Sequence, residues 1–192
     1  QTSFSGWDFT DVWTMDEDNS FPYLQNLIPS SLPGEGLMSI APSGEGTQAS
    51  PYLISNFTEL YWLSITPSVW DSSFQQTADI DASESSGYNS GSGFSPIGSS
   101  NTRFTGAYDG ADYTIAGLFI NRDSEDLVGL FGSVEDAGLT NIGLENADIT
   151  GQDSVGVLVG KVSGHSNITN SYSSGTVSGN KVIGGLVGKL IS

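Results

Sequence analysis

Apolar residues in the C-terminal third of the chain come in short groups separated by glycine, serine and asparagine. Leu127-Val128, Leu130-Phe131 and the isolated Leu139 are examples. No group is long enough for a helix, and valine and isoleucine between glycine-rich breaks are typical of short strands. Residues 127–192 are therefore predicted to form strands of roughly three to five residues each.

The groups return at a fixed interval. Two sets of residues recur every 28 positions: Leu130, Leu158 and Leu186, and Gly132, Gly160 and Gly188. Thr140-Asn141 and Thr169-Asn170 are 29 apart, so one unit gains a residue, which we expect within a turn. Such a unit cannot bury its own apolar face, whereas stacked units pair strand on strand around a continuous interior. The prediction is an all-β, right-handed parallel β-helix (a solenoid); an antiparallel meander is the alternative.

The repeat assigns structural roles to individual residues. Six apolar positions are expected to face the interior: Leu130, Leu144, Ile149, Leu158, Val177 and Leu186. Gly132, Gly160 and Gly188 are expected at corners of the repeat, where glycine tolerates a left-handed backbone.

Residues 47–126 read as the N-terminal part of the same β-helix. Asn56 followed by Glu59 resembles a helix-capping box, and Pro67 ends the apolar pattern that follows it. A short helix near residues 56–66 would cover the open end of the stack, where strand edges are otherwise unpaired. Residues 76–81 alternate as a strand does, and residues 83–100 read as a long loop.

The segment 1–29 is rich in large aromatic side chains. Trp7, Phe9, Trp13, Phe21 and Tyr23 fall within this short stretch and offer a large apolar area. They suit a lid that covers another surface, such as the end of a preceding repeat array. The segment 30–46 contains prolines and glycines and reads as a linker.

Charge narrows the range of partners. The chain has 22 acidic and 5 basic residues, a net charge of −17, and no lysine or arginine before Arg103. Such a surface does not favour nucleic acid or an anionic membrane, and no apolar run is long enough for membrane insertion. Without cysteine there is neither a disulfide framework nor a thiol nucleophile.

The repeat resembles a known family. The phrases "VGLFG", "VGVLVG" and "IGGLVG", with "NITNSYSSGTVSG", resemble the GLUG repeat of large bacterial surface and secreted proteins, including IgA-protease-like and filamentous-haemagglutinin-like adhesins. Upstream, "FTGAYDGADYTIAGLFI" resembles the segment that introduces such repeats. The resemblance covers roughly residues 46–192 and implies a β-helix on an extracellular or bacterial cell-surface protein; it implies no particular activity.

Catalytic chemistry has little support in the sequence. Paired carboxylates that hydrolyse glycosides could come from Asp79 with Asp81, or from Asp109 with Asp112. These aspartates lie in phrases where turn hydrogen bonds are the ordinary role. His165 lies in a sequence typical of a turn and is predicted to be a solvated loop residue. We therefore expect a non-enzyme.

The sequence also offers candidate residues for two kinds of binding site, one for calcium and one for carbohydrate. Calcium, the one cofactor considered, would find oxygen ligands at Asp16, Asp18, Asp79 and Asp81, although no complete calcium loop is present. A carbohydrate-binding or carbohydrate-cleaving β-helix is the alternative function, with Trp62, Trp70 or residues 83–100 meeting the sugar.

The expected function is structural and adhesive. We interpret the chain as a stiff stalk or contact surface of an extracellular protein that mediates cell adhesion. Its expected partners are neighbouring modules, or copies of itself joined head-to-tail into filaments, and a glycan or protein on a host or other surface.

Overall fold

The computed structural model describes residues 13–14, 23–24 and 39–191, and the chain divides into two compact units, Gln1–Met38 and Ser39–Ser192. In the first unit, β1 (Trp13–Thr14) pairs antiparallel with β2 (Tyr23–Leu24), which places Trp13 opposite Leu24. The other lid residues, Trp7, Phe9 and Phe21, and the calcium candidates Asp16 and Asp18 lie outside the described residues.

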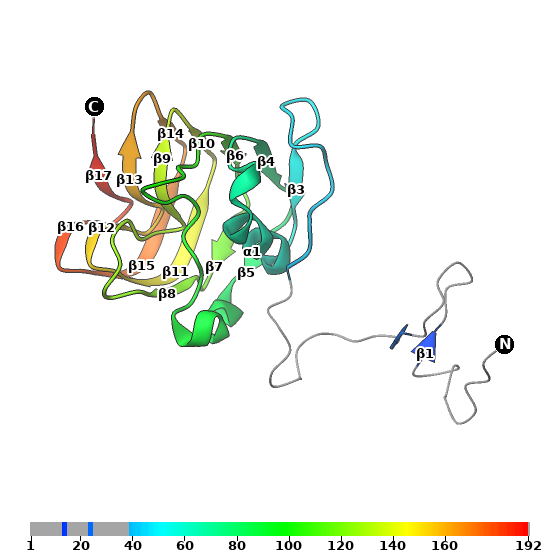
Figure 1. The fold of residues 1–192 in the computed structure, drawn as a ribbon, viewed down its shortest axis with the longest axis horizontal. Helices are drawn as coiled ribbons and strands as arrows, with labels where there is room; N and C mark the ends of the chain where they lie inside the picture. Colours follow the sequence, from blue (N-terminus) through cyan, green and yellow to red (C-terminus); the bar gives the residue numbers. More distant parts are fainter. Residues whose placement is uncertain (1–12, 15–22, 25–38, 192) are drawn as a thin grey trace. The chain divides into compact units, whose positions relative to one another are not determined.

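The second unit consists mostly of strands in parallel sheets (Figure 1). The largest sheet has the order β14 (Asn167–Thr169), β10 (Gly138–Thr140), β6 (Ala107–Asp109), β4 (Ser73–Gln76), β3 (Tyr52–Ile54). The next has the order β15 (Tyr172–Ser178), β11 (Gly143–Thr150), β7 (Thr114–Ala116), β5 (Ile80–Asp81), and β8 (Phe119–Asn121) also pairs with β11.

Two smaller sheets complete the unit. One has the order β17 (Val187–Leu190), β13 (Val159–Ser163), β9 (Phe131–Glu135), and the other pairs β12 (Asp153–Gly156) with β16 (Lys181–Gly184). The helical elements are α1 (Phe57–Ile65) and the 3-10 turns η1 (Pro67–Val69), η2 (Ser83–Gly87) and η3 (Asn89–Gly91).

The register explains the interval in the sequence. Val159 pairs with Val187, and Ile149 pairs with Val177, so each residue meets the one that follows it by a full repeat interval. Every pairing between named strands in residues 39–191 is parallel, so the antiparallel meander is wrong for this part of the chain. Each strand thus pairs with its equivalent in the next repeat unit.

The extra residue predicted for one repeat unit lies in a turn, as expected. Glu135 pairs with Ser163, 28 positions on, whereas Gly138 pairs with Asn167, 29 positions on, and residues 164–165 form the turn between them.

A bulge in β11 then restores the offset of 28. The offset between β11 and β15 is 29 at Leu144 and Ser173 but 28 at Ala147 and Gly175, with an irregularity between. Asn146 has a φ of 52° there. One strand therefore accommodates an additional residue while pairing continues on both sides of it, as in other β-bulges.

The interior is built of apolar residues that succeed one another from unit to unit. In the largest sheet Phe74, Tyr108, Leu139 and Ile168 occupy consecutive positions of the register. The first three are buried and Ile168 is half-buried, since it belongs to the last described unit. Burial of one such side chain contributes about 2 kcal/mol to folding.

The expected interior residues follow the same trend. Leu130, Leu144, Ile149 and Leu158 are fully buried. Val177 and Leu186, which belong to the last described unit, are half-buried against the core.

The helix lies at the end of the unit that carries β3, and β16 and β17 lie at the opposite end (Figure 1). Asn56 Oδ1 accepts a hydrogen bond of 3.1 Å from the Glu59 amide, and Glu59 Oε2 accepts from the backbone and hydroxyl of Ser55. Side chains of α1 that face the core are those of Phe57, Leu60, Tyr61, Leu63 and Ser64. This is the only α-helix in residues 39–191.

The repeat glycines differ from the sequence-based expectation. Gly132, Gly160 and Gly188 lie within β9, β13 and β17 rather than at left-handed corners, and none of them has a positive φ. A Cβ atom at Gly160 would lie 2.7 Å from the carbonyl oxygen of Gly132, and one at Gly188 would lie 2.7 Å from that of Gly160. Glycine is needed here because the backbones of adjacent units approach too closely for a side chain.

Candidate functional site

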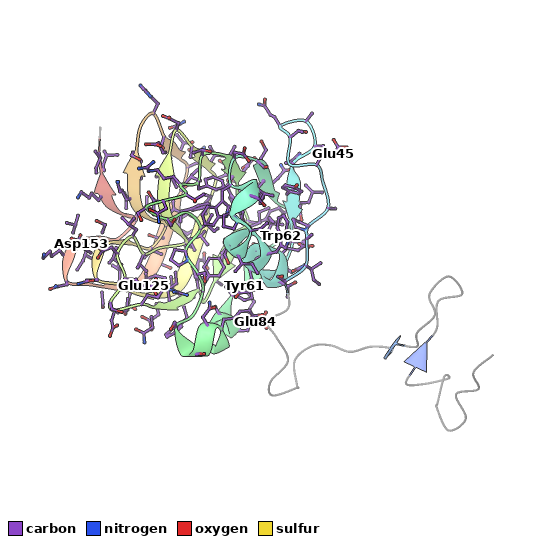
Figure 2. All side chains as sticks on the ribbon, viewed as in Figure 1. Glu45, Tyr61, Trp62, Glu84, Glu125 and Asp153 are labelled. Carbon is purple, nitrogen blue, oxygen red and sulfur yellow. The ribbon has the colours of Figure 1, made fainter. Side chains whose placement is uncertain are left out.

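A groove crosses the face of the second unit that carries β13 and β17. It has a volume of about 540 Å³ and is lined by parts of residues 96–100, 125–127 and 153–154, together with Lys161 and Lys189. Glu125 and Asp153 lie close together at the end of the unit that carries β12 and β16 (Figure 2). We refer to this groove, with all the residues that line it, as the lysine groove.

The register of two strands places the lysines. Lys161 on β13 and Lys189 on β17 are direct partners in neighbouring parallel strands, and Ser133 on β9 precedes them in the same column. Ser133 is fully buried, and its hydroxyl has no hydrogen-bond partner. Residues 97 and 104 bridge to β9, and between them Ser99–Thr102 form a turn at the edge of the groove.

Few charges around the groove are paired. Arg122 bonds to Glu125 at 2.9 Å, and Arg103 bonds to Glu135 at 3.2 Å. Among the described residues, neither lysine of the groove has a carboxylate within 4 Å. The groove thus presents two ammonium groups and the carboxylates of Glu125, Asp126 and Asp153.

The other aspartates considered as ligands or catalysts hold the backbone. Asp79 Oδ1 accepts bonds from the amide and hydroxyl of Thr114, at 2.8 and 3.1 Å. Asp81 Oδ1 accepts from the Ser83 amide at 3.0 Å. Among the described residues, no group of three or more His, Cys, Asp or Glu is placed to hold a metal ion.

Asp109 takes part in a polar column along the stack. Its Oδ1 accepts bonds from the Ala111 amide at 2.9 Å and from Asn141 Nδ2 at 2.8 Å. Asn170 Nδ2 in turn donates to Asn141 Oδ1 at 3.2 Å. The second carboxylate of this pair, Asp112, stands in the adjoining turn with a φ of 64°. The column ties successive repeat units together.

Electrostatics does not give Asp81 the properties of a general acid. Hydrogen bonds from the side chain and backbone of Ser83 lower the pKa of Asp81, whereas a general acid at neutral pH needs a raised pKa. His165 is fully exposed, and its backbone amide donates to Asp136 Oδ1 at 2.8 Å. It is a solvated turn residue, as the sequence indicates.

The aromatic residues proposed to meet a sugar lie in the core or against it. Trp70 is 6% exposed, and its Nε1 donates to the Leu63 carbonyl oxygen at 2.8 Å, so the prediction that Trp70 meets a sugar is wrong. Trp62 is half-buried and packs edge-on against Tyr52. Within residues 83–100, Tyr88 packs on Tyr61 and Phe57, and burial raises the pKa of Tyr88.

The lysine groove was not predicted from the sequence, although the sequence carries one sign of it. Lys161 and Lys189 are separated by one repeat interval, so the repeat alone places them side by side. Glu125 and Asp126 likewise precede Asp153 and Ser154 by 28 residues, whereas residues 96–100 lie outside the repeat.

Comparison with known proteins identifies the repeat. The model of the GLUG motif matches residues 151–178. Halomucin from Haloquadratum walsbyi is 41% identical over 152 residues, 76% of this chain and 2% of the relative. A putative Gly-rich membrane protein from Evansella cellulosilytica is 33% identical over 137 residues, 69% of this chain and 15% of the relative.

The chain therefore spans only a small part of these two relatives, and neither of their names denotes an enzyme. No solved structure matches the chain. In the described part of the chain, no helix has the length and apolar character that crossing a membrane requires.

Proposed function

We propose that this chain, which carries a GLUG motif at residues 151–178, is a non-catalytic section of a large cell-surface protein and folds as a right-handed parallel β-helix. In this role it is a stiff spacer or contact surface outside the cell. The names of the two relatives, a mucin and a membrane protein, agree with a surface location.

One observation supports the proposal above the others. Equivalent strands of successive repeat units pair in parallel and in register, as the partners Leu139 with Ile168 and Val159 with Val187 illustrate. Backbone hydrogen bonds therefore run along the direction in which units are added, and each added unit lengthens the stack without changing its cross-section. No bound cofactor is needed for this role.

Surface location is tested with antibodies raised against residues 39–191. Intact cells that produce the full-length protein should be labelled as strongly as permeabilised cells. Labelling of permeabilised cells alone would contradict the proposal, and an antibody against a cytoplasmic protein serves as the control.

We also propose that further copies of the repeat, from a neighbouring module or another molecule, stack on the last described unit and extend it into filaments. Support comes from the apolar side chains at this end, where Leu190 is 75% exposed and Val182 and Ile183 are nearly half exposed. The strands β14, β15, β16 and β17 each lie at the edge of their sheet.

Sedimentation velocity at increasing protein concentration tests the filament. Species of growing mass are expected, and replacing Leu190 and Ile183 by aspartate should leave monomers. A wild-type chain that remains monomeric at all concentrations would contradict head-to-tail assembly of this chain.

A further inference from the structure

The backbones of Lys161 and Lys189 belong to the stacked strands, but their side chains form no ion pair between repeat units in the described part of the chain, so the composition of the groove calls for a separate explanation. We propose that the groove binds a neutral oligosaccharide through the sugar hydroxyl groups. A volume of about 540 Å³ is within the range of small-ligand sites. The inference does not depend on the surface location of the protein.

The first argument comes from the lysines. Lys161 and Lys189 are direct partners on adjacent strands, and like charges in that position destabilise a sheet. The chain has 22 acidic residues available to neutralise them, yet neither lysine has a carboxylate within 4 Å among the described residues. An acceptor atom bound between the two ammonium groups would offset their repulsion.

The second argument comes from the other polar groups that line the groove. Asp126 and Asp153 accept hydrogen bonds and cannot donate them, while lysine donates and cannot accept. Ser99 and Ser100 do both. A ligand that contacts both kinds of charged group must accept hydrogen bonds from the lysines and donate them to the carboxylates, and a sugar hydroxyl can do both.

Charge favours a neutral sugar over an acidic one. The groove holds three carboxylates and two ammonium groups, within a chain of net charge −17. This field repels an anionic ligand on approach. Among the described residues, no aromatic ring lines the groove, so affinity rests mainly on hydrogen bonds, and we expect a dissociation constant of about 1 mM.

The test is an NMR titration of the whole chain with cellotetraose and with maltotetraose. We expect amide shifts confined to the groove, from at least one of the two sugars. The double variant Lys161→Gln/Lys189→Gln should weaken binding at least about tenfold. Lys181→Gln is the matched control because Lys181 carries the same charge on neighbouring β16 but does not line the groove, and its affinity should be unchanged.

A second pair of variants separates the carboxylates from general charge effects. Asp126→Asn should weaken binding, whereas Asp123→Asn, outside the groove, should not. Far-UV circular dichroism checks that each variant is folded. The proposal is overturned if neither tetrasaccharide shifts the groove amides, if Lys181→Gln weakens binding as much as the double variant, or if tetragalacturonate binds more tightly than both neutral sugars.

Discussion

At the scale of single residues, the repeat is maintained by close backbone contact. Gly98, Gly132, Gly160 and Gly188 form a column in which each of the last three lies against the carbonyl oxygen of the one before it. Left-handed backbone is instead supplied by residues such as Asn141 and Asn170, with φ of 55° and 50°. Asparagine tolerates this conformation better than other side chains do.

Gly160→Ala tests the close contact. The new Cβ would lie 2.7 Å from backbone atoms of Gly132, Leu127 and Val128, so the two units must move apart. We expect a loss of about 1–3 kcal/mol in the free energy of unfolding, measured by urea denaturation. Gly185→Ala is the control, because nothing lies within 4 Å of its Cβ position. Equal stability of the two variants would contradict this explanation.

Tyr108 should make the fold sensitive to alkali. Burial raises the pKa of its phenol, which donates to Gln76 Oε1 at 3.3 Å. The unfolded state releases this proton near pH 10, and the folded state holds it to higher pH. The contribution to stability is therefore complete below about pH 10 and is lost as the pH rises beyond it.

Tyr108→Phe removes this ionisation. The free energy of unfolding should fall less steeply between about pH 9 and 11 than in the wild type, although it starts about 1 kcal/mol lower because Gln76 Oε1 loses its donor. Tyr113→Phe, at an exposed position, should retain the wild-type slope. Identical slopes in all three proteins would show that Tyr108 does not contribute to alkaline unfolding.

At the scale of elements, the sequence predicts whatever is local or repeated. The capping pair Asn56 and Glu59 and the regular repeat interval lead to a helix and to parallel strands, and both are present. The bulge at Asn146 was not predicted, because it depends on how two units of unequal length pack together. The lysine groove was not predicted, because residues 96–100, which help to line it, lie outside the repeat. The glycine column was misinterpreted since a sequence shows where glycine recurs but not what its missing side chain would contact.

Asn56→Ala tests the helix start. The Glu59 amide would lose its 3.1 Å bond to Asn56 Oδ1, and we expect the free energy of unfolding to fall by about 1 kcal/mol. Asn101→Ala, in an exposed turn, should change it by less than about 0.5 kcal/mol. Thermal denaturation of both variants gives the comparison. A neutral Asn56→Ala would mean that tertiary contacts alone hold α1.

At the scale of the whole molecule, the net charge of −17 acts against the compact state. Sodium chloride should raise the melting temperature by screening this repulsion. Calcium chloride at equal ionic strength should add nothing further to the stability of residues 39–191, because no group of acids in that part of the chain is placed to hold a metal. A saturable rise at low calcium concentration, reversed by a chelator, would instead demonstrate a bound ion.

The central claim is that equivalent residues of successive repeat units lie side by side in parallel strands. Asp148 and Thr176 are register partners, with 2.8 Å between the Thr176 hydroxyl and Asp148 Oδ1. Neighbouring strands are about 4.8 Å apart, within the Cα range of a disulfide, and the chain has no cysteine of its own. Oxidation of the double variant Asp148→Cys/Thr176→Cys therefore measures the register directly. We expect rapid intramolecular disulfide formation in this variant and none in Asp148→Cys/Lys181→Cys. Failure of the first variant to form the disulfide, or its ready formation in the second, would contradict the parallel register.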